Sequence, residues 1–302
     1  MTLSPNRNAS EELAMDVTSR IELALDGALR QGEAPGHPPG LARALRHAVF
    51  PGGARIRPQL TLAVAGACGD RDSAVSDAAA AAIELLHCAS LVHDDLPCFD
   101  DAALRRGRPS VHKLFGERLA VLAGDALIVM AFETLGRSGG DHPERLARLL
   151  VVVGAAVGTP FGISAGQAWE CEPSLDLVQY QRAKTGALFA GATMAGAAAA
   201  GFEPVLWRAL GEGLGEAYQV ADDIRDVVGN PDEMGKPVGQ DAALGRPNAV
   251  HALGMEGAIA RLEALVHAAA DSIPDCPGQG PLKTLIQREA QRFLPKELRR
   301  AA

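Results

Sequence analysis

The stretch "LVHDDLPCFDDAALRRGRPSVH", residues 91–112, places four aspartates and three arginines directly after an apolar segment. The residues before it, "AAAAAIELLHCAS" at 78–90, are rich in alanine and leucine, which favour a helix. Asp94 and Asp100 are six residues apart, so an ideal helix would misalign them. Pro97 lies between them, and an interior proline disrupts a helix. We therefore expect a bulge at Pro97 that returns Asp100 to the position of a DDxxD spacing.

A second acidic group, "YQVADDIRDVVGNPDEMGKPVGQD" at 218–241, also ends an apolar segment. Asp222 and Asp226 are four residues apart, so a helix would project both carboxylates from one face, where they repel. Taken singly, each acid is typical of a solvated surface with arginine and lysine neighbours. Together, with no cysteine pair or histidine pair among them, the two groups favour an oxygen-rich site for a hard cation. Mg²⁺ bridged to a polyphosphate fits this chemistry, because Mg²⁺ prefers few carboxylates together with phosphate oxygens.

The composition predicts a folded, helical protein. The chain has 302 residues, of which 47% are hydrophobic and 22% charged, so it can bury a large core. Aromatic residues make up only 4%, whereas alanine, leucine and glycine dominate, which favours tightly packed helices over sheets. No linker, charge block or repeat divides the chain. We expect one all-α domain that spans residues 1–302.

Apolar periodicity and Gly/Pro clusters place the helices, and no convincing strand pattern appears. The expected helices are 10–31, 40–49, 56–69, 72–95, 114–137, 142–158, 175–201, 204–229, 250–272 and 279–298.

Charge and cysteine usage narrow the partners and the compartment. A net charge of -8 disfavours nucleic acid, because phosphate backbones are bound by a basic surplus. Five cysteines form no CxxC pair, which is typical of reduced thiols. The N-terminal residues 1–16 lack the basic and apolar regions of a signal peptide. We expect a cytoplasmic protein that does not bind nucleic acid.

Two charge-free stretches, 149–169 and 185–202, approach the length that spans a membrane. Both are rich in alanine and glycine, and Pro160 interrupts the first. Charged segments flank both closely, which also disfavours insertion. We interpret them as core helices of a protein without a membrane span.

The chain resembles the trans-isoprenyl diphosphate synthases, the polyprenyl synthetase family, over nearly its full length. Both aspartate-rich groups resemble motifs of that family. Four further segments match in order and spacing: "GGARIRP" at 52–58, "ELLHCASLVHDD" at 84–95, "AGQAWE" at 165–170 and "AKTGALFAGA" at 183–192.

The resemblance implies an isoprenoid-synthase fold, a single large helical bundle around a deep central cavity, with the two aspartate motifs facing each other. It also implies a homodimer with about three Mg²⁺ ions per active site, which hold the diphosphate of an allylic substrate. The implied metal ligands are Asp94, Asp95, Asp100, Asp222, Asp223 and Asp226.

The same resemblance assigns the substrate contacts of a head-to-tail condensation with isopentenyl diphosphate. Residues expected at the allylic diphosphate are Arg105, Lys184, Thr185, Gln219 and Lys236. Those expected at isopentenyl diphosphate are Arg57, His87 and Arg106. For Thr185 and Gln219 an ordinary helical hydrogen bond remains the alternative, and for His87 a core position.

Two positions depart from the family pattern. Ala54 stands where a lysine usually contacts isopentenyl diphosphate, so one charge-assisted contact is missing; such contacts contribute about 1.5 to 3 kcal/mol. Arg55, or a cation from elsewhere, is the alternative supplier. Ala102 replaces an aspartate of many relatives, which we interpret as a minor change because Asp94 and Asp100 remain.

Ala89 and Ser90 are expected to determine chain length. They lie five and four residues before Asp94, where a bulky side chain in relatives stops growth at the farnesyl product. Small residues leave room for another isoprene unit, so the resemblance favours a geranylgeranyl diphosphate synthase that feeds carotenoid or related prenyl-lipid biosynthesis. The alternatives are a farnesyl diphosphate synthase, a terpene cyclase, and a non-catalytic regulatory subunit of a related prenyl synthase.

Overall fold

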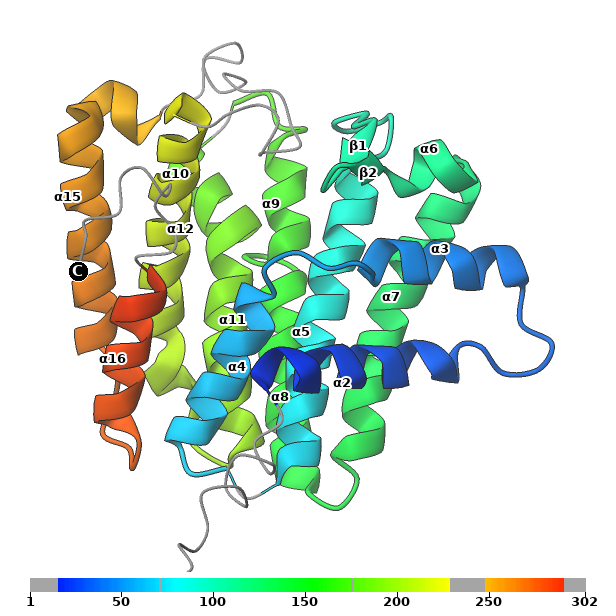
Figure 1. Ribbon diagram of the computed structural model, residues 1–302, viewed down its shortest axis with the longest axis horizontal. Coiled ribbons are helices and arrows are strands. Elements are labelled where there is room, and N and C mark those ends of the chain that lie inside the picture. The colour runs from blue at the N-terminus through cyan, green and yellow to red at the C-terminus, as the bar shows by residue number, and fades with distance from the viewer. Residues whose placement is uncertain (1–15, 71, 175, 229–247, 291–302) are drawn as a thin grey trace, which may run out of the picture.

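A computed structural model describes residues 16–70, 72–174, 176–228 and 248–290. It is a bundle of helices in which long, roughly parallel rods stand side by side and two shorter helices run across them part-way along their length (Figure 1). The rods are α5 (Ser73–Asp94), α7 (Glu117–Ser138), α8 (Pro143–Val157), α11 (Ala187–Ala199), α12 (Arg208–Val228) and α15 (Ala249–Asp271). The crossing pair is α2 (Val17–Gln31) and α3 (Pro39–Val49), and α4 (Ile56–Ala67) and α16 (Gln279–Ala290) complete the bundle. The prediction of an all-α fold is confirmed.

Helix α11 is the central element, and its sequence explains why it can be. Every residue from Leu188 to Ala199 is buried, and most are alanine or glycine. A Cβ added at Gly196 would lie 2.3 Å from the Thr61 carbonyl oxygen of α4, and one at Gly211 of α12 would lie 2.4 Å from the Ala190 Cα. Small side chains therefore let the backbones of α4, α11 and α12 pack closely. This agrees with the tightly packed helices that the composition predicts.

Several expected helices are interrupted in the structure. The segment predicted at 114–137 forms α6 (Val111–Phe115) and α7, separated by Gly116 at φ 85°, a conformation that favours glycine. The segment predicted at 175–201 forms α10 (Leu177–Gln181), a π-helical turn at Arg182–Gly186 and α11. The segment predicted at 204–229 begins with a 3₁₀ turn, Pro204–Trp207, before α12. Each interruption is local, so the helix order is unchanged.

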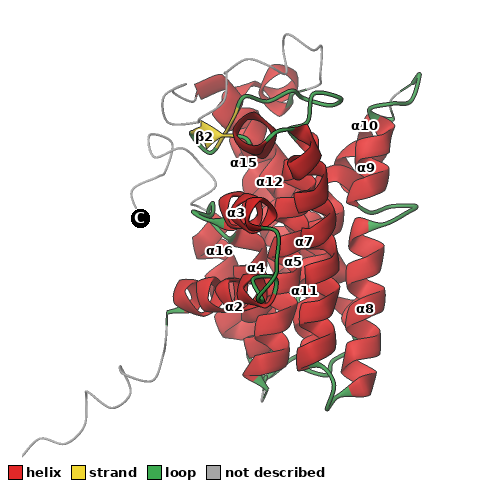
Figure 2. Ribbon diagram, turned by 90° about the vertical axis from the view of Figure 1, so that its right-hand side faces the viewer, coloured by secondary structure: helices red, strands yellow, loops and turns green. Residues whose placement is uncertain are grey.

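A small hairpin was not anticipated. Strands β1 (Leu104–Arg105) and β2 (Arg108–Pro109) pair antiparallel around Arg106 and Gly107, whose φ angles of 54° and 72° suit a two-residue hairpin turn. Two-residue strands carry no detectable alternation, so periodicity could not reveal them. Figure 2 shows this hairpin beyond the ends of the helical rods.

The charge-free stretches differ in outcome. Residues 185–202 lie in and around buried α11, as expected. Residues 149–169 do not form one core helix: α8 ends at Val157, α9 (Ile163–Trp169) follows, and Val151 is 72% exposed. Among the described residues, α5 and α7 are instead the helices long and apolar enough to cross a membrane, by length and composition only. In α5, 78% of the apolar stretch is buried inside the protein, as in a core helix. In α7 the buried share is 39%.

Candidate active site

The aspartates of the first motif meet where α5 ends. The helix stops at Asp94, and the Asp100 amide donates to the Asp94 carbonyl oxygen at 3.0 Å. The chain thus turns back on itself after the helix, which differs from the bulge within a continuing helix that Pro97 suggested. The outcome is the expected one, because the Asp94 and Asp100 carboxylates lie close together.

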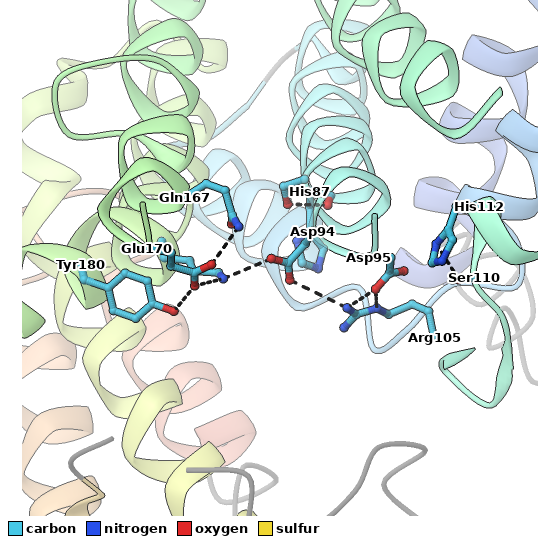
Figure 3. Close-up of polar contacts among 11 residues, drawn as sticks. His87, Asp94, Asp95, Arg105, Ser110, His112, Gln167, Glu170 and Tyr180 are labelled. Atoms are coloured by element: carbon cyan, nitrogen blue, oxygen red, sulfur yellow. Dashed lines mark hydrogen bonds and ion pairs between the residues drawn. The ribbon is translucent and has the colours of Figure 1, made fainter. Parts of the chain in front are cut away.

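Glu170 joins these two aspartates. One oxygen from each of Asp94, Asp100 and Glu170 lies within 4.8 Å of the others. Glu170 follows α9 directly, and it accepts hydrogen bonds from the Tyr180 hydroxyl at 2.6 Å and the Gln167 amide at 2.9 Å (Figure 3). The site prediction omitted Glu170, although it closes the "AGQAWE" segment that supported the resemblance. Oxygen ligands at this spacing suit a hard cation such as Mg²⁺.

Lys184 connects the aspartates to Glu170. Its ammonium lies 3.2 Å from Asp94 and 2.5 Å from Glu170. Burial disfavours the charged form, but Asp94, Tyr180 and Glu170 outweigh it and raise the pKa of Lys184. Lys184 and Thr185 both lie in the π-helical turn, an irregularity that recurs at functional sites. The predicted lysine is therefore a permanent cation among three carboxylates.

Arg105 approaches the first motif from the hairpin. Its Nε donates to the Asp95 carboxylate at 2.9 Å, its Nη2 donates to the same oxygen, and Nη2 lies 3.8 Å from Asp94 (Figure 3). Asp95 is 2% exposed, and burial raises its pKa despite Arg105. Burial and then Asp94 raise the pKa of Asp100. Asp95 thus faces Arg105, and its predicted part in metal binding stays a prediction.

The second motif lies in the last turns of α12. Asp222 is 3.3 Å from Arg225, and Asp226 is buried. Asp223 accepts from the Gln219 amide at 3.2 Å and from the Ala249 backbone N–H at 2.8 Å, where α15 begins. In the described part of the chain, the tight carboxylate cluster does not include these aspartates. Their metal role stays a prediction.

Two other predicted contacts have different outcomes. The Thr185 hydroxyl, in the π-helical turn, donates to the side-chain oxygen of Gln219 on α12 at 3.5 Å, so the structure brings these two residues together. Gln219 in turn donates to Asp223, which links the π-helical turn to the second motif. Lys236 lies outside the described residues.

The three residues predicted for isopentenyl diphosphate, Arg57, His87 and Arg106, are called here the cationic group, after its two arginines. Arg57 and His87 approach within 3.5 Å, and the Arg57 guanidinium stacks 4.5 Å above the Phe189 ring. The buried Nε of Arg57 has no hydrogen-bond partner among the described residues. The guanidinium of Arg106 lies against the backbone of Gly53, where a Cβ would be 3.0 Å from its Nε. A buried guanidinium with an unshared donor suits an anionic ligand.

His87 gives a pH-dependent prediction. Burial and then Arg57, Arg106, Arg105 and Arg55 lower the pKa of His87 well below 6.5. The native ring stays neutral where the unfolded ring takes up a proton, so stability falls as the pH drops through 6.5. The loss is up to about 1.4 kcal/mol per pH unit until the native pKa is reached.

We expect His87→Gln to remove this loss. Its Tm relative to the unmodified protein should rise by about 2 to 4 °C between pH 7.5 and pH 5.5, measured by thermal unfolding. The exposed His251, changed to Gln, provides the control. A Tm difference for His87→Gln that stays constant over this range would contradict the neutral state.

The chain-length positions lie one turn below the carboxylates. Ala89 is 1% exposed, and Ser90, whose hydroxyl donates to the His87 carbonyl oxygen at 2.8 Å, is partly buried. Neither side chain is large. A groove of about 740 Å³ is lined by residues of α2, α3, α6 and the hairpin, and Asp94, Asp100 and Glu170 are not among its lining residues. The deep central cavity therefore stays a prediction.

Arg55 does not replace the missing lysine. Ala54 is exposed beside the cationic group, but Arg55 is 3% exposed and its side chain is bonded to Glu22, Glu84 and the Val49 carbonyl oxygen. The suggestion that Arg55 supplies the absent cation is wrong, because its donors are used inside the protein.

Known proteins match this arrangement over most of the chain. The polyprenyl synthetase family pattern matches residues 38–275. A geranylgeranyl diphosphate synthase of Cereibacter sphaeroides is 52% identical over 94% of this chain and 99% of its own length. One from Rhodobacter capsulatus is 51% identical over 93% of this chain and 97% of its own.

A solved structure agrees with these sequence matches. The geranyltransferase of Helicobacter pylori, complexed with magnesium and isoprenyl diphosphate, superposes with a TM-score of 0.74 at 29% identity. It covers 93% of this chain and 99% of its own. Together with the aspartate cluster and the order of the helices, these matches place the chain in the polyprenyl synthetase family.

Proposed function

We propose that the protein is a geranylgeranyl diphosphate synthase, a prenyltransferase that condenses an allylic diphosphate head-to-tail with isopentenyl diphosphate. The observation that carries the proposal is the cluster of Asp94, Asp100, Glu170 and Lys184 close to the Arg105 guanidinium. Carboxylates that can hold Mg²⁺ and fixed cations that can hold phosphate oxygens occur together, as ionisation of a diphosphate ester requires. The names of the two close relatives support the same activity.

The donor set fits a magnesium-dependent reaction. Asp94, Asp100 and Glu170 would hold Mg²⁺, and we propose that the aspartates of the second motif and Asp95 complete a site for about three ions. Mg²⁺ held there would neutralise charge on the diphosphate oxygens and so make pyrophosphate a better leaving group.

The chain's own residues act on the two substrates. Lys184 and Arg105 would bind the allylic diphosphate and balance the charge that develops on its oxygens as the carbon–oxygen bond breaks. Arg57 and Arg106 would hold isopentenyl diphosphate, with His87 as a neutral hydrogen-bonding partner. Thr185 and Gln219 would direct oxygens toward the allylic cation. The alkene of isopentenyl diphosphate then forms the new bond, and loss of a proton to pyrophosphate completes the reaction.

A turnover assay tests the proposal. Purified protein with Mg²⁺, isopentenyl diphosphate and an allylic starter should give a linear twenty-carbon diphosphate, identified by chromatography. A fifteen-carbon product would favour the farnesyl enzyme. A released hydrocarbon would identify a cyclase, and no turnover without a paralogous partner would identify a regulatory subunit.

We also propose a homodimer that uses α7. Val121, Leu122 and Val129 recur on one face of this helix and are 42%, 52% and 57% exposed, and Leu114 of α6 adds to the surface. A stripe this apolar on a partly buried helix is typical of a protein interface. Light scattering should give the mass of two chains, and Leu122→Glu should lower it to one. A wild-type monomer would contradict the proposal.

We further propose that residues 1–302 act as one domain in the cytoplasm.

Ala54→Lys is expected to strengthen isopentenyl diphosphate binding. The exposed backbone position beside Arg106 leaves the lysine free to reach the diphosphate, and one charge-assisted contact is worth about 1.5 to 3 kcal/mol. We expect the KM for isopentenyl diphosphate to fall about tenfold and that for the allylic substrate to change little. Ala54→Gln, of similar length without the charge, is the control. An unchanged or raised KM in Ala54→Lys would show that another group already occupies the place.

A further inference from the structure

A buried charge cluster lies behind the cationic group. Arg55 connects α2 to α5: its Nε donates to Glu22 at 2.8 Å and its Nη1 donates to Glu84 at 2.6 Å. Its Nη2 donates to the Val49 carbonyl oxygen at 2.8 Å. The Arg55 and Glu84 side chains are 1% and 2% exposed, whereas Glu22 is 35% exposed. The guanidinium thus has partners on every side and is not available to a ligand.

Arg55 also fixes the backbone of the loop that leads into α4. Its own φ of 51° lies in the left-handed region, which costs about 1 to 2 kcal/mol for a residue with a Cβ. Gly52 lies directly against the guanidinium, since a Cβ at Gly52 would be 2.0 Å from the Arg55 Cζ. Charge pairs and the missing side chain at Gly52 therefore hold residues 52–55 in one conformation.

The same loop and helix carry the predicted diphosphate contacts. Arg57 lies two residues beyond Arg55, in the first turn of α4. Gly53 supports the Arg106 guanidinium, and His87 follows Glu84 by three residues, so both lie on one side of α5. Arg55 is thus connected to Arg57 through two residues of backbone, and Glu84 to His87 through one turn of α5.

We propose that the Glu22–Arg55–Glu84 cluster is a positioning device for isopentenyl diphosphate, an inference that rests on the proposed function. It would hold Arg57, and the Gly53 backbone that supports Arg106, in fixed positions. Because Ala54 contributes no cation, Arg57 of α4 and Arg106 of the hairpin turn carry the proposed ionic contacts with isopentenyl diphosphate. Their placement then determines how tightly isopentenyl diphosphate binds, because a charge-assisted hydrogen bond requires a short distance and good alignment.

Arg55→Lys tests the device, because lysine keeps the charge but cannot donate in three directions at once. The KM for isopentenyl diphosphate should rise about tenfold, while kcat and the KM for the allylic substrate stay within about twofold. Direct calorimetric titration with isopentenyl diphosphate should show the same loss of affinity. Hydrogen exchange should increase at the amides of residues 52–57.

Arg46→Lys is the matched control. Arg46 pairs with Asp26 at 2.9 Å and Glu33 at 2.5 Å, within the segment from α2 to α3, and among the described residues its side-chain hydrogen bonds go to these two acids rather than to residues 52–55. It should lower Tm without changing the KM for isopentenyl diphosphate. If Arg55→Lys does not fold, Glu22→Gln removes only the partly exposed partner, and the same KM should rise about threefold.

These experiments distinguish a failure of the proposed function from a failure of the positioning role of Arg55. Absence of turnover and of isopentenyl diphosphate binding in the wild-type protein would overturn the proposed function, and loop exchange would still report on the cluster. Turnover in which folded Arg55→Lys and Glu22→Gln leave this KM unchanged, or alter both KM values alike, would overturn the positioning role alone.

Discussion

Asp94→Ala is expected to lower kcat by about a thousandfold or more while the helical content stays intact. The Asp94 carboxylate lies within 4.8 Å of Asp100 and Glu170 and also pairs with Lys184. Its removal takes one oxygen ligand from the proposed magnesium site and one partner from the lysine, so charge developing on the leaving diphosphate loses stabilisation. Steady-state turnover at saturating Mg²⁺ and circular dichroism measure the two quantities.

Asp101→Ala provides a control from the same turn. Its carboxylate is 56% exposed and pairs with Lys113 at 2.9 Å, outside the carboxylate cluster. We expect a kcat within about threefold of wild type, because an exposed ion pair contributes little. If Asp94→Ala retained a comparable rate, the cluster would not be the site of ionisation. Asp222→Ala should match Asp94→Ala if the second motif completes the same metal site.

Ala89→Phe is expected to convert most of the product from twenty to fifteen carbons. The side chain of Ala89 is 1% exposed and lies one to two turns before the carboxylates, toward the interior of the bundle. A ring added there occupies space that the growing tail needs, so elongation stops one isoprene unit earlier. Overpacking should also destabilise the protein by about 1 to 3 kcal/mol. Chromatography of the products after a fixed number of turnovers gives the ratio of chain lengths.

Ala89→Ser is the control, because it changes the same residue but keeps the side chain small. It should leave the twenty-carbon product dominant. A wild-type enzyme that already stops at fifteen carbons would contradict the assignment of the pocket floor. So would an Ala89→Phe variant whose products match those of wild type. In the second case the floor would lie deeper along the neighbouring helices.

The helices of the fold were predictable because their signals are local. Ala-rich and Leu-rich periodicity predicted α5 at 72–95, and the structure has Ser73–Asp94. Gly116 divides the segment predicted at 114–137, and its φ of 85° is a backbone requirement that hydrophobic periodicity does not record. The π-helical turn at Arg182–Gly186 was missed for a similar reason, since one inserted residue scarcely alters a 3.6-residue period.

The candidate site was predicted unevenly. Paired aspartates repel one another, so their occurrence at two helix ends already pointed to a cation. Glu170 gave no such signal, because a single acid after "GQAW" is typical of an exposed turn. The reverse error concerned Arg55, whose position beside Ala54 made it a candidate ligand until the structure showed it buried between Glu22 and Glu84.

The sequence by itself determined the chemical groups and most of the helices that carry them: two aspartate motifs, Arg105, Arg106, Lys184 and an all-α chain. Only the tertiary structure decided which groups meet. Lys184 and Asp94 are 90 residues apart, and Arg55 and Glu84 are 29 apart, yet both pairs are in contact. Helical periodicity is set by hydrogen bonds between residues four apart, so it can be read locally. Contacts between helices depend on how whole surfaces pack, which small residues such as Gly196 and Gly211 permit but do not specify.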